Sequence, residues 1–197
     1  MQIILASSSI YRLNLLKQIN IMPEIIMPDI DESALFNESP CQTSQRLAYE
    51  KAKKVQHIKS SQLNNSYDNS IIIGSDQVLL LDKETLGKPL THENAVKQLQ
   101  KMRNKSMIFY TSITMLNQQK KFEACVETKV TMRNYSDELI EKYLTIEKPY
   151  NCAGSAKSEG LGVVLIKEMI STDPTALIGL PLSKVLDGLE YFNYPIL

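Results

Sequence analysis

The sequence has few of the residues that build disulfide frameworks and transition-metal sites. Its 197 residues include three cysteines, Cys41, Cys125 and Cys152, which are widely spaced and form no Cys-x-x-Cys pair. Neither a disulfide framework nor a zinc site is therefore indicated. Two histidines, His57 and His92, cannot build a histidine-rich metal site. Any metal here is expected to be a hard cation held by carboxylates, with phosphate oxygens as further ligands.

An excess of charge and a long apolar run are also absent. Lys plus Arg number 22 and Asp plus Glu number 22, so the formal net charge is zero, which argues against a surface built as a nucleic-acid footprint. No apolar run approaches the roughly 18 residues that a membrane span needs. The N-terminal Met-Gln-Ile-Ile-Leu-Ala lacks the basic and long apolar regions of a signal peptide. We therefore expect a cytoplasmic protein that binds neither a membrane nor a nucleic-acid polymer.

The order of the expected strands and helices predicts the fold class. No repeat and no linker divides the chain, which favours one domain over residues 1–197. Apolar and alternating runs predict strands at 2–6, 23–27, 71–73, 78–81, 106–116, 121–133 and 163–170. Helical spacing predicts helices near 13–19, 44–55, 92–102, 137–144 and from 181 onward. Thr91 and Ser136 are expected to cap the helices at 92–102 and 137–144, and 60–69 is expected to be a flexible polar loop. The interleaving predicts an α/β fold with a mixed, twisted sheet flanked by helices.

The segment 71–89 contains a carboxylate in apolar surroundings. Asp76 lies at the expected mouth of the strand 71–73, and the apolar run resumes at 78–81 before a charged turn at 82–84. Burying a carboxylate is costly unless a metal, a cation or a substrate pairs with it. A helix cap or a structural ion pair explains the same pattern equally well.

The loop after the first strand suits an anion. Ser7, Ser8 and Ser9 follow a short apolar strand and precede a helical pattern, so free backbone N–H groups at the helix start could receive a phosphate. Arg12 in the first turn could add a charge-assisted hydrogen bond. The simpler alternative is that Ser9 caps the helix and Arg12 is solvated.

Two further loops carry polar side chains with open interpretations. Asp29, Asp31 and Glu32 form an acidic cluster that suits either a metal shell or a solvated loop. The segment 150–162 contains three glycines, which let backbone approach a ligand closely, but a plain loop accounts for them as well.

Several short segments stand in a characteristic order along the chain. They are LASSSIYR (5–12), Asp31-Glu32 with RLAYEKA (46–52), GSDQV (74–78) with LGKP (86–89), NCAGSAKSEG (151–160) and GLPL (179–182). Together, in this order, they resemble the Maf family. The resemblance covers nearly the whole chain. It implies a nucleoside triphosphate pyrophosphatase that cleaves between the α- and β-phosphates with a divalent metal, Mg²⁺ or Mn²⁺. It also implies a fold similar to the inosine-triphosphate pyrophosphatases, with a cleft between two lobes, and a homodimer.

The resemblance assigns roles to individual residues. Three cations and two hydroxyls would bind the triphosphate, and they are Arg12, Lys51, Lys88, Ser7 and Ser9. Lys51 and Lys88 count among the catalytic residues because positive charge is needed in the transition state. Glu32 and Asp76 would hold the metal, and the resemblance favours Asp76 as the proton acceptor. Sequence alone does not separate a base from a ligand at Asp76.

Three positions match the specificity positions of the family, and they are Tyr11, Gln77 and Glu159. The sequences SDQ and AGSAKSEG resemble the subfamily that hydrolyses 7-methyl-GTP rather than the dTTP/UTP branch. A methylated guanine carries positive charge, so an aromatic face could stack on it with a cation–π gain. Glu159 could accept hydrogen bonds from the guanine N1–H and amine.

Two departures from the family pattern bear on this assignment. Ile10 stands where the family has proline, and Leu13 stands where the subfamily has a second arginine. The first loop is therefore expected to be less rigid and to carry one positive charge fewer. Two alternatives remain: a dTTP/UTP pyrophosphatase of the same family, and a nucleotide-binding regulator of septum formation without turnover.

Overall fold

The computed structural model describes residues 1–62 and 70–196. The strands within these ranges are β1 (Gln2–Ala6), β2 (Glu24–Ile25), β3 (Ser70–Leu81), β4 (Glu84–Leu86), β5 (Ser106–Leu116), β6 (Lys121–Met132) and β7 (Ile166–Ser171). The α-helices are α1 (Ile10–Gln18), α2 (Pro40–Gln62), α3 (His92–Met102), α4 (Asp137–Glu147) and α5 (Leu182–Tyr191). Three short 3₁₀ turns are η1 (Ala153–Ser155), η2 (Leu161–Leu165) and η3 (Ala176–Ile178).

The strands form a mixed sheet. Their order is β2-β1-β3-β5-β6-β7, and β4 pairs with β3 beside this path. β1 is parallel to both β2 and β3, whereas β3–β4 and β6–β7 are antiparallel. The predicted α/β class with a mixed sheet is confirmed.

The chain divides into two compact units. The first unit comprises 1–76, 111–126 and 173–197, and the second comprises 77–110 and 127–172. β3, β5 and β6 each contribute residues to both units. The expectation of one domain with a cleft between two lobes stays a prediction.

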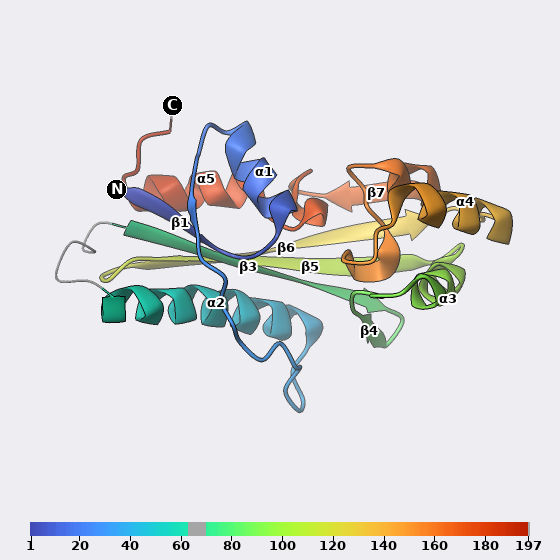
Figure 1. Ribbon diagram of the computed structural model, residues 1–197, viewed down its shortest axis with the longest axis horizontal. Coiled ribbons are helices and arrows are strands. Elements are labelled where there is room, and N and C mark those ends of the chain that lie inside the picture. Colours follow the sequence, from blue (N-terminus) through green and yellow to red (C-terminus); the bar gives the residue numbers. More distant parts are fainter. Residues whose placement is uncertain (63–69, 197) are drawn as a thin grey trace. The chain divides into compact units, whose positions relative to one another are not determined.

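In the first unit, strand alternation separates two apolar cores. Ile3, Leu5, Ile71 and Ile73 pack with residues of α1 and α5, including Leu16 and Leu189. Ile4, Ala6 and Ile72 face the other way and pack with Ala52 and Val55 of α2. Successive side chains of a strand point to opposite faces, which explains this division. Figure 1 accordingly shows α2 on one side of these strands and α1 and α5 on the other.

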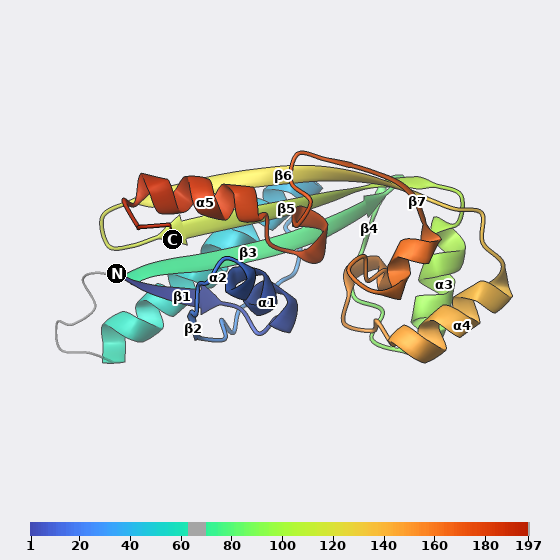
Figure 2. The ribbon, with the colours of Figure 1, turned by 90° about the horizontal axis from the view of Figure 1, so that it is seen from above.

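In the second unit, α3 and α4 pack side by side, as Figure 2 also shows. Thr91 caps α3 by accepting from Asn94 N at 3.2 Å, as the sequence predicted. Ser136 caps α4 by accepting from Leu139 N at 3.3 Å, also as predicted. The Tyr135 hydroxyl donates to the carbonyl of Leu99 at 2.8 Å and so ties the segment before α4 to α3.

Several boundaries differ from the expectations. β3 is continuous, so Asp76 lies inside a strand rather than at the mouth of one. α2 begins at Pro40 instead of residue 44, because proline suits the first turn of a helix. Residues 163–165 belong to η2, so β7 starts three residues later than expected. The loop expected at 60–69 begins as the last turn of α2, and residues 63–69 lie outside the described residues. No helix among the described residues is long and apolar enough to cross a membrane.

Candidate active site

The contact between α2 and β3 forms the centre of the candidate site. A Cβ at Gly74 would lie 2.2 Å from the carbonyl oxygen of Ala48 and 2.8 Å from the nitrogen of Ala52, so a side chain would hold the helix away. Lys51 precedes Ala52, and Asp76 lies two residues beyond Gly74 on the same face of β3. The close packing therefore brings Lys51 Nζ within 2.6 Å of Asp76 Oδ1.

Lys51 pairs with two carboxylates at once. Its Nζ also lies 2.6 Å from Glu32 Oε1. Lys51 is 6% exposed and Asp76 is 7% exposed, whereas Glu32 is exposed. The sequence reasoning proposed a metal, a cation or a substrate as the partner of Asp76, and the structure shows the cation.

Burial also changes the protonation of Asp76. Desolvation raises the pKa of Asp76 above its usual value, while Lys51 and Arg12 act to lower it and Glu32 acts to raise it. A raised pKa moves a carboxylate closer to the pH at which a general base works best. Such a residue is a candidate for catalysis, and the same shift also accompanies structural ion pairs.

The first loop brings serine and arginine side chains together. Ser9 caps α1 by accepting from Arg12 N at 3.4 Å, which confirms the predicted cap. Ser7 Oγ accepts from Ser9 N at 3.0 Å and from Arg12 Nη1 at 3.3 Å. Arg12 is half-buried and hydrogen-bonded, so its interpretation as a solvated residue is wrong. Tyr11, in the same turn, is half-buried.

The carbonyl group of Gly179 orients Arg12. It accepts from Arg12 Nε at 2.8 Å and from Ser75 Oγ at 2.9 Å. Gly179 has φ +118°, a backbone conformation that favours glycine. With Nε and Nη1 occupied, Nη2 has no hydrogen-bond acceptor within 1–62 and 70–196. Burial lowers the pKa of Arg12, and the charges of Asp76 and Glu32 oppose this. The planar guanidinium can present Nη2 to an anion.

Asp173, which sequence reasoning missed, fixes the loop that carries Gly179. Its carboxylate accepts from the backbone N–H groups of Thr175, Ala176 and Ser183 at 2.7, 3.0 and 2.7 Å, and from the Thr175 hydroxyl at 2.6 Å. Burial acts to raise the pKa of Asp173, but hydrogen bonds from Ser183 and Thr175 outweigh it and lower the pKa. The sequence Asp-Pro-Thr is a turn signal that could have marked this residue.

In the second unit, the segments around Lys88 and Glu159 are linked to each other. The carbonyl of Gly87 accepts from Gln98 Nε2 at 3.0 Å and from Gly154 N at 3.3 Å. The same Gln98 accepts from Ser155 Oγ at 2.7 Å. Gln98 therefore connects the LGKP segment to the loop 150–162. Hydrogen bonds to the LGKP segment and to α3 hold this loop in place.

Lys88 and Glu159, the predicted charged residues of the second unit, are more accessible than Lys51 and Asp76 of the first. Lys88 and Glu159 are exposed, and Gln77 is half-buried. Lys157 is paired with Glu147 at 2.6 Å, so the loop keeps this lysine in an internal ion pair. For Gln77, Lys88 and Glu159 the structure gives the exposure and the neighbouring contacts. Their roles in catalysis and substrate recognition stay predictions.

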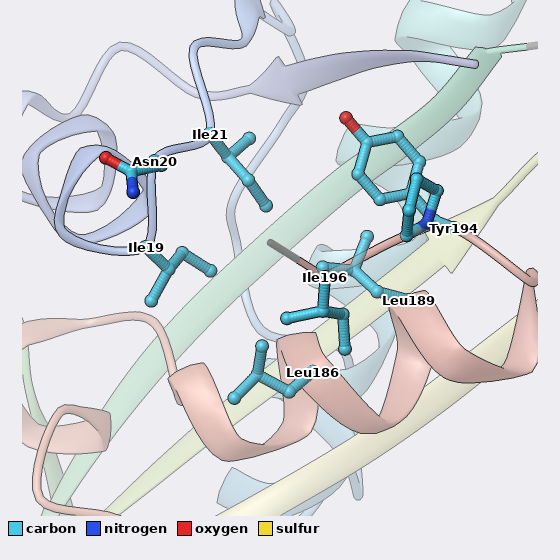
Figure 3. A pocket seen from close by; sticks show the side chains of 8 residues that line it. Ile19, Asn20, Ile21, Leu186, Leu189, Tyr194 and Ile196 are labelled. Atoms are coloured by element: carbon cyan, nitrogen blue, oxygen red, sulfur yellow. The ribbon is translucent and has the colours of Figure 1, made fainter.

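An apolar hollow in the first unit does not suit a triphosphate. It is enclosed by three segments, which are the end of α1, helix α5 and the C-terminal segment (Figure 3). Its volume is about 110 Å³. Its lining consists of Ile19, Asn20, Ile21, Leu186, Leu189, Tyr194, Pro195 and Ile196. Ligand sites usually measure roughly 300–1,000 Å³ and need polar groups that match the ligand. The hollow has no charged side chain, so the candidate site is the group around Asp76.

The fold and this charged group define an α/β protein that handles anionic, phosphate-like ligands. The chain belongs to the Maf family, because residues 2–192 match the family described as Maf-like protein. This confirms the family that the ordered motifs indicated.

Two relatives match nearly the whole chain. A 7-methyl-GTP pyrophosphatase of Methylobacillus flagellatus is 47% identical over 189 residues, which are 95% of this chain and 94% of the relative. A 7-methyl-GTP pyrophosphatase of Cupriavidus pinatubonensis is 42% identical over 196 residues, 98% of this chain and 94% of the relative. The solved Ham1 protein of Staphylococcus aureus aligns with a TM-score of 0.42 at 19% identity, over 68% of this chain and 73% of that one. At that TM-score the likeness carries no argument.

Proposed function

We propose that this protein is a nucleoside triphosphate pyrophosphatase that hydrolyses 7-methyl-GTP to the monophosphate and pyrophosphate. The observation that carries the proposal is the buried pair of Lys51 and Asp76, with Glu32 on the same ammonium and Arg12 close enough to interact with both carboxylates. Relatives named 7-methyl-GTP pyrophosphatase share 42% to 47% of their residues with nearly the full chain, which supports the same substrate.

Charge neutralisation is the main task in this reaction. A triphosphate brings about four negative charges, and phosphoryl transfer depends on positioning and on positive groups at the phosphate oxygens. Arg12 is held through Nε and Nη1, so Nη2 can donate to a phosphate oxygen. Lys51 and Lys88 supply further positive charge, and Ser7 and Ser9 supply neutral donors. The role of Lys88 rests on the family resemblance.

Asp76 is the proposed proton acceptor. In the hydrolysis, the oxygen of a water molecule attacks the α-phosphorus, and the bond between the α-phosphorus and the bridging oxygen breaks. Asp76 takes the proton of that water, and the bridging oxygen leaves on pyrophosphate. The raised pKa of Asp76 makes it a stronger base than an exposed aspartate. Lys51, at 2.6 Å, acts to lower this pKa and so favours the ionised carboxylate.

The residues also fit a divalent metal. Two carboxylates, Glu32 and Asp76, converge on one positively charged position, each at 2.6 Å from Lys51 Nζ. No group of three or more metal-binding side chains occurs within the described parts of the chain. Mg²⁺ commonly takes one or two carboxylates, with substrate phosphates and waters completing its shell. Glu32 and Asp76 would hold Mg²⁺ or Mn²⁺, which supplies Lewis-acid stabilisation of phosphate charge.

Base recognition, assembly and location complete the proposal. Tyr11 would stack on the methylated guanine, Glu159 would accept from its N1–H and amine, and Gln77 is the third specificity position. A homodimer and a cytoplasmic location are proposed on the family resemblance.

The test is pyrophosphate release from 7-methyl-GTP, GTP, dTTP, UTP and CTP, with Mg²⁺ or Mn²⁺, beside the variant Asp76→Asn. Fast turnover of 7-methyl-GTP that depends on Asp76 is the expected result. Preference for dTTP or UTP would assign the protein to the other branch of the family. Binding of nucleotides without turnover would overturn the proposed enzymatic function and favour the alternative, a nucleotide-binding regulator of septum formation.

A further inference from the structure

Two cysteines that are far apart in the sequence lie next to each other in the first unit. Cys41 Sγ and Cys125 Sγ are 3.6 Å apart, and the two residues are separated by 84 positions. Neither is in a disulfide, and both are half-buried. A disulfide needs the two sulfurs at about 2.05 Å, so the two sulfur atoms must approach each other by about 1.5 Å.

The alignment of α2 with the β5–β6 hairpin places these cysteines opposite each other. Lys121 Nζ of β6 lies 5.0 Å from the ring centroid of Tyr49, one contact along the helix from the cysteines. The helix rises about 12 Å from Cys41 to Tyr49, and the strand spans about 13 Å from Cys125 to Lys121. Because these two lengths match, the Cys41–Cys125 and Tyr49–Lys121 contacts can form at the same time along one helix and one strand.

Further contacts hold α2 in this position at both ends. Gln56 Nε2 donates to the carbonyl of Asn117 at 3.0 Å near the far end of the helix. Near the cysteines, the buried hydroxyls of Ser44 and Ser112 lie 2.7 Å apart. The proximity of the thiols is therefore set by separate contacts along the helix and the hairpin, which gives the two thiols a high effective concentration.

The two thiols are not equivalent in reactivity. Cys41 is the second residue of α2, and the first turn of this helix contains no acidic residue. The positive end of a helix stabilises a thiolate, which is the nucleophilic form of cysteine. Cys41 is therefore the attacking sulfur, and Cys125 is placed to resolve the product.

We propose that Cys41 and Cys125 form a redox-modification site that closes to a reversible disulfide when a low-molecular-weight disulfide is the oxidant. The Cys41 thiolate attacks one sulfur of the oxidant, whose S–S bond breaks and releases one thiol. Cys125 then attacks Cys41 Sγ of the mixed disulfide and releases the second thiol. The two protons of the cysteines pass to the two leaving thiolates, so the protein loses two protons and two electrons. The bond links the start of α2, the helix that carries Lys51, to β6.

The test uses the full chain in glutathione buffers of increasing oxidised fraction, followed by alkylation, intact mass and peptide mapping. We expect the loss of two alkylatable thiols and of two hydrogens in mass, a linked peptide containing Cys41 and Cys125, and reversal by dithiothreitol. Cys152 should remain alkylated. A stable glutathione adduct without the linked peptide, a bond to Cys152, or no reaction would each overturn the proposal.

Matched variants and stability give a second readout. Cys152→Ser should form the same disulfide, whereas Cys125→Ser should stop at one bound glutathione on Cys41. The bond constrains the unfolded chain across 84 positions, so the oxidised protein should melt about 5 °C higher or more. Cys41→Ser and Cys125→Ser should show no redox-dependent change in melting temperature. An equal change in either variant would contradict the pairing.

Discussion

The two units present their candidate residues in opposite ways. In the first unit, Lys51 and Asp76 are 6% and 7% exposed and are bonded to each other. In the second unit, Lys88 and Glu159 are exposed, although the backbone beside Lys88 is held through Gly87 and Gln98. Lys51 and Asp76 therefore have desolvated side chains, whereas Lys88 and Glu159 have accessible side chains on or near an anchored backbone.

This difference suggests a division of work. A desolvated carboxylate and ammonium interact more strongly than exposed ones, and the ammonium acts to lower the pKa of the carboxylate. They suit proton transfer and charge stabilisation. Exposed side chains on fixed backbone keep rotamer freedom and interact little with the rest of the protein, so they suit contact with a ligand. Substitutions in the first unit should therefore change chemistry and stability together, and those in the second unit should change only activity or selectivity.

The largest effect is expected for Asp76→Asn. An amide cannot accept the proton of the attacking water, so kcat should fall by about 10²–10⁴-fold, the usual contribution of a general base. Lys51 keeps Glu32 as a partner, so the melting temperature should fall, but by less than in Lys51→Gln. The control is Asp82→Asn, an exposed acid in the β3–β4 turn. If Asp76→Asn kept the kcat of the wild type, Asp76 would not be the general base.

Lys51→Gln should lower both activity and stability, in a pH-dependent way. The pKa of Asp76 is raised in the folded state, so ionisation of Asp76 costs stability as pH rises through that pKa, and Lys51 offsets this cost. Without Lys51 the pKa should rise further, which moves the acidic limb of the kcat/KM profile to higher pH. The loss of stability should be about 3 kcal/mol at neutral pH and smaller at acid pH, where Asp76 becomes neutral.

Thermal melts and kinetic profiles across pH check this prediction, with Lys54→Gln on the exposed side of α2 as the control. An acidic limb that moves to lower pH in Lys51→Gln would contradict the expected direction, since it would mean that Lys51 does not stabilise the ionised carboxylate.

Asp173→Asn tests whether Arg12 depends on the loop that carries Gly179. An amide cannot accept at both of its ends, so the hydrogen bond from Ser183 N or those from the Thr175 segment should be lost, at about 1–3 kcal/mol. Through Gly179 the guanidinium of Arg12 loses its orientation, so KM should rise about tenfold. Asp187→Asn on α5 is the matched control. Lower stability with unchanged KM would leave Asp173 a purely structural residue.

Lys88→Gln is the counterpart of Lys51→Gln in the second unit. The side chain is exposed, so the melting temperature and the pH profile should stay those of the wild type. The loss of one positive charge should lower kcat/KM by about tenfold at low salt and less at high salt, because salt screens exposed charges. Lys83→Gln in the neighbouring turn is the control. A stability loss equal to that of Lys51→Gln would break the comparison between the units.

The sequence predicted the helices and strands of this fold better than the contacts that join them. The alternation of β5 and the caps at Thr91 and Ser136 depend on neighbours in sequence, so they could be predicted. The ion pair of Lys51 with Asp76 depends on how closely α2 approaches Gly74, which no local pattern specifies. The same holds for Cys41 and Cys125, whose wide spacing argued against pairing until the register of α2 on the hairpin was known.

The smallest effect on rate is expected for Glu159→Gln, and it is a change of selectivity. Glutamine keeps the shape of the side chain but presents an amide where the guanine N1–H and amine need an acceptor, so the preference for 7-methyl-GTP over UTP should fall about tenfold. The side chain is exposed, so stability should not change. Relative kcat/KM values across the nucleotide panel measure this, with Glu168→Gln on β7 as the control. Unchanged ratios would move base recognition away from Glu159. Altered ratios at wild-type stability would support the view that Glu159 of the second unit takes part in selecting the substrate while the buried pair of the first unit carries the chemistry.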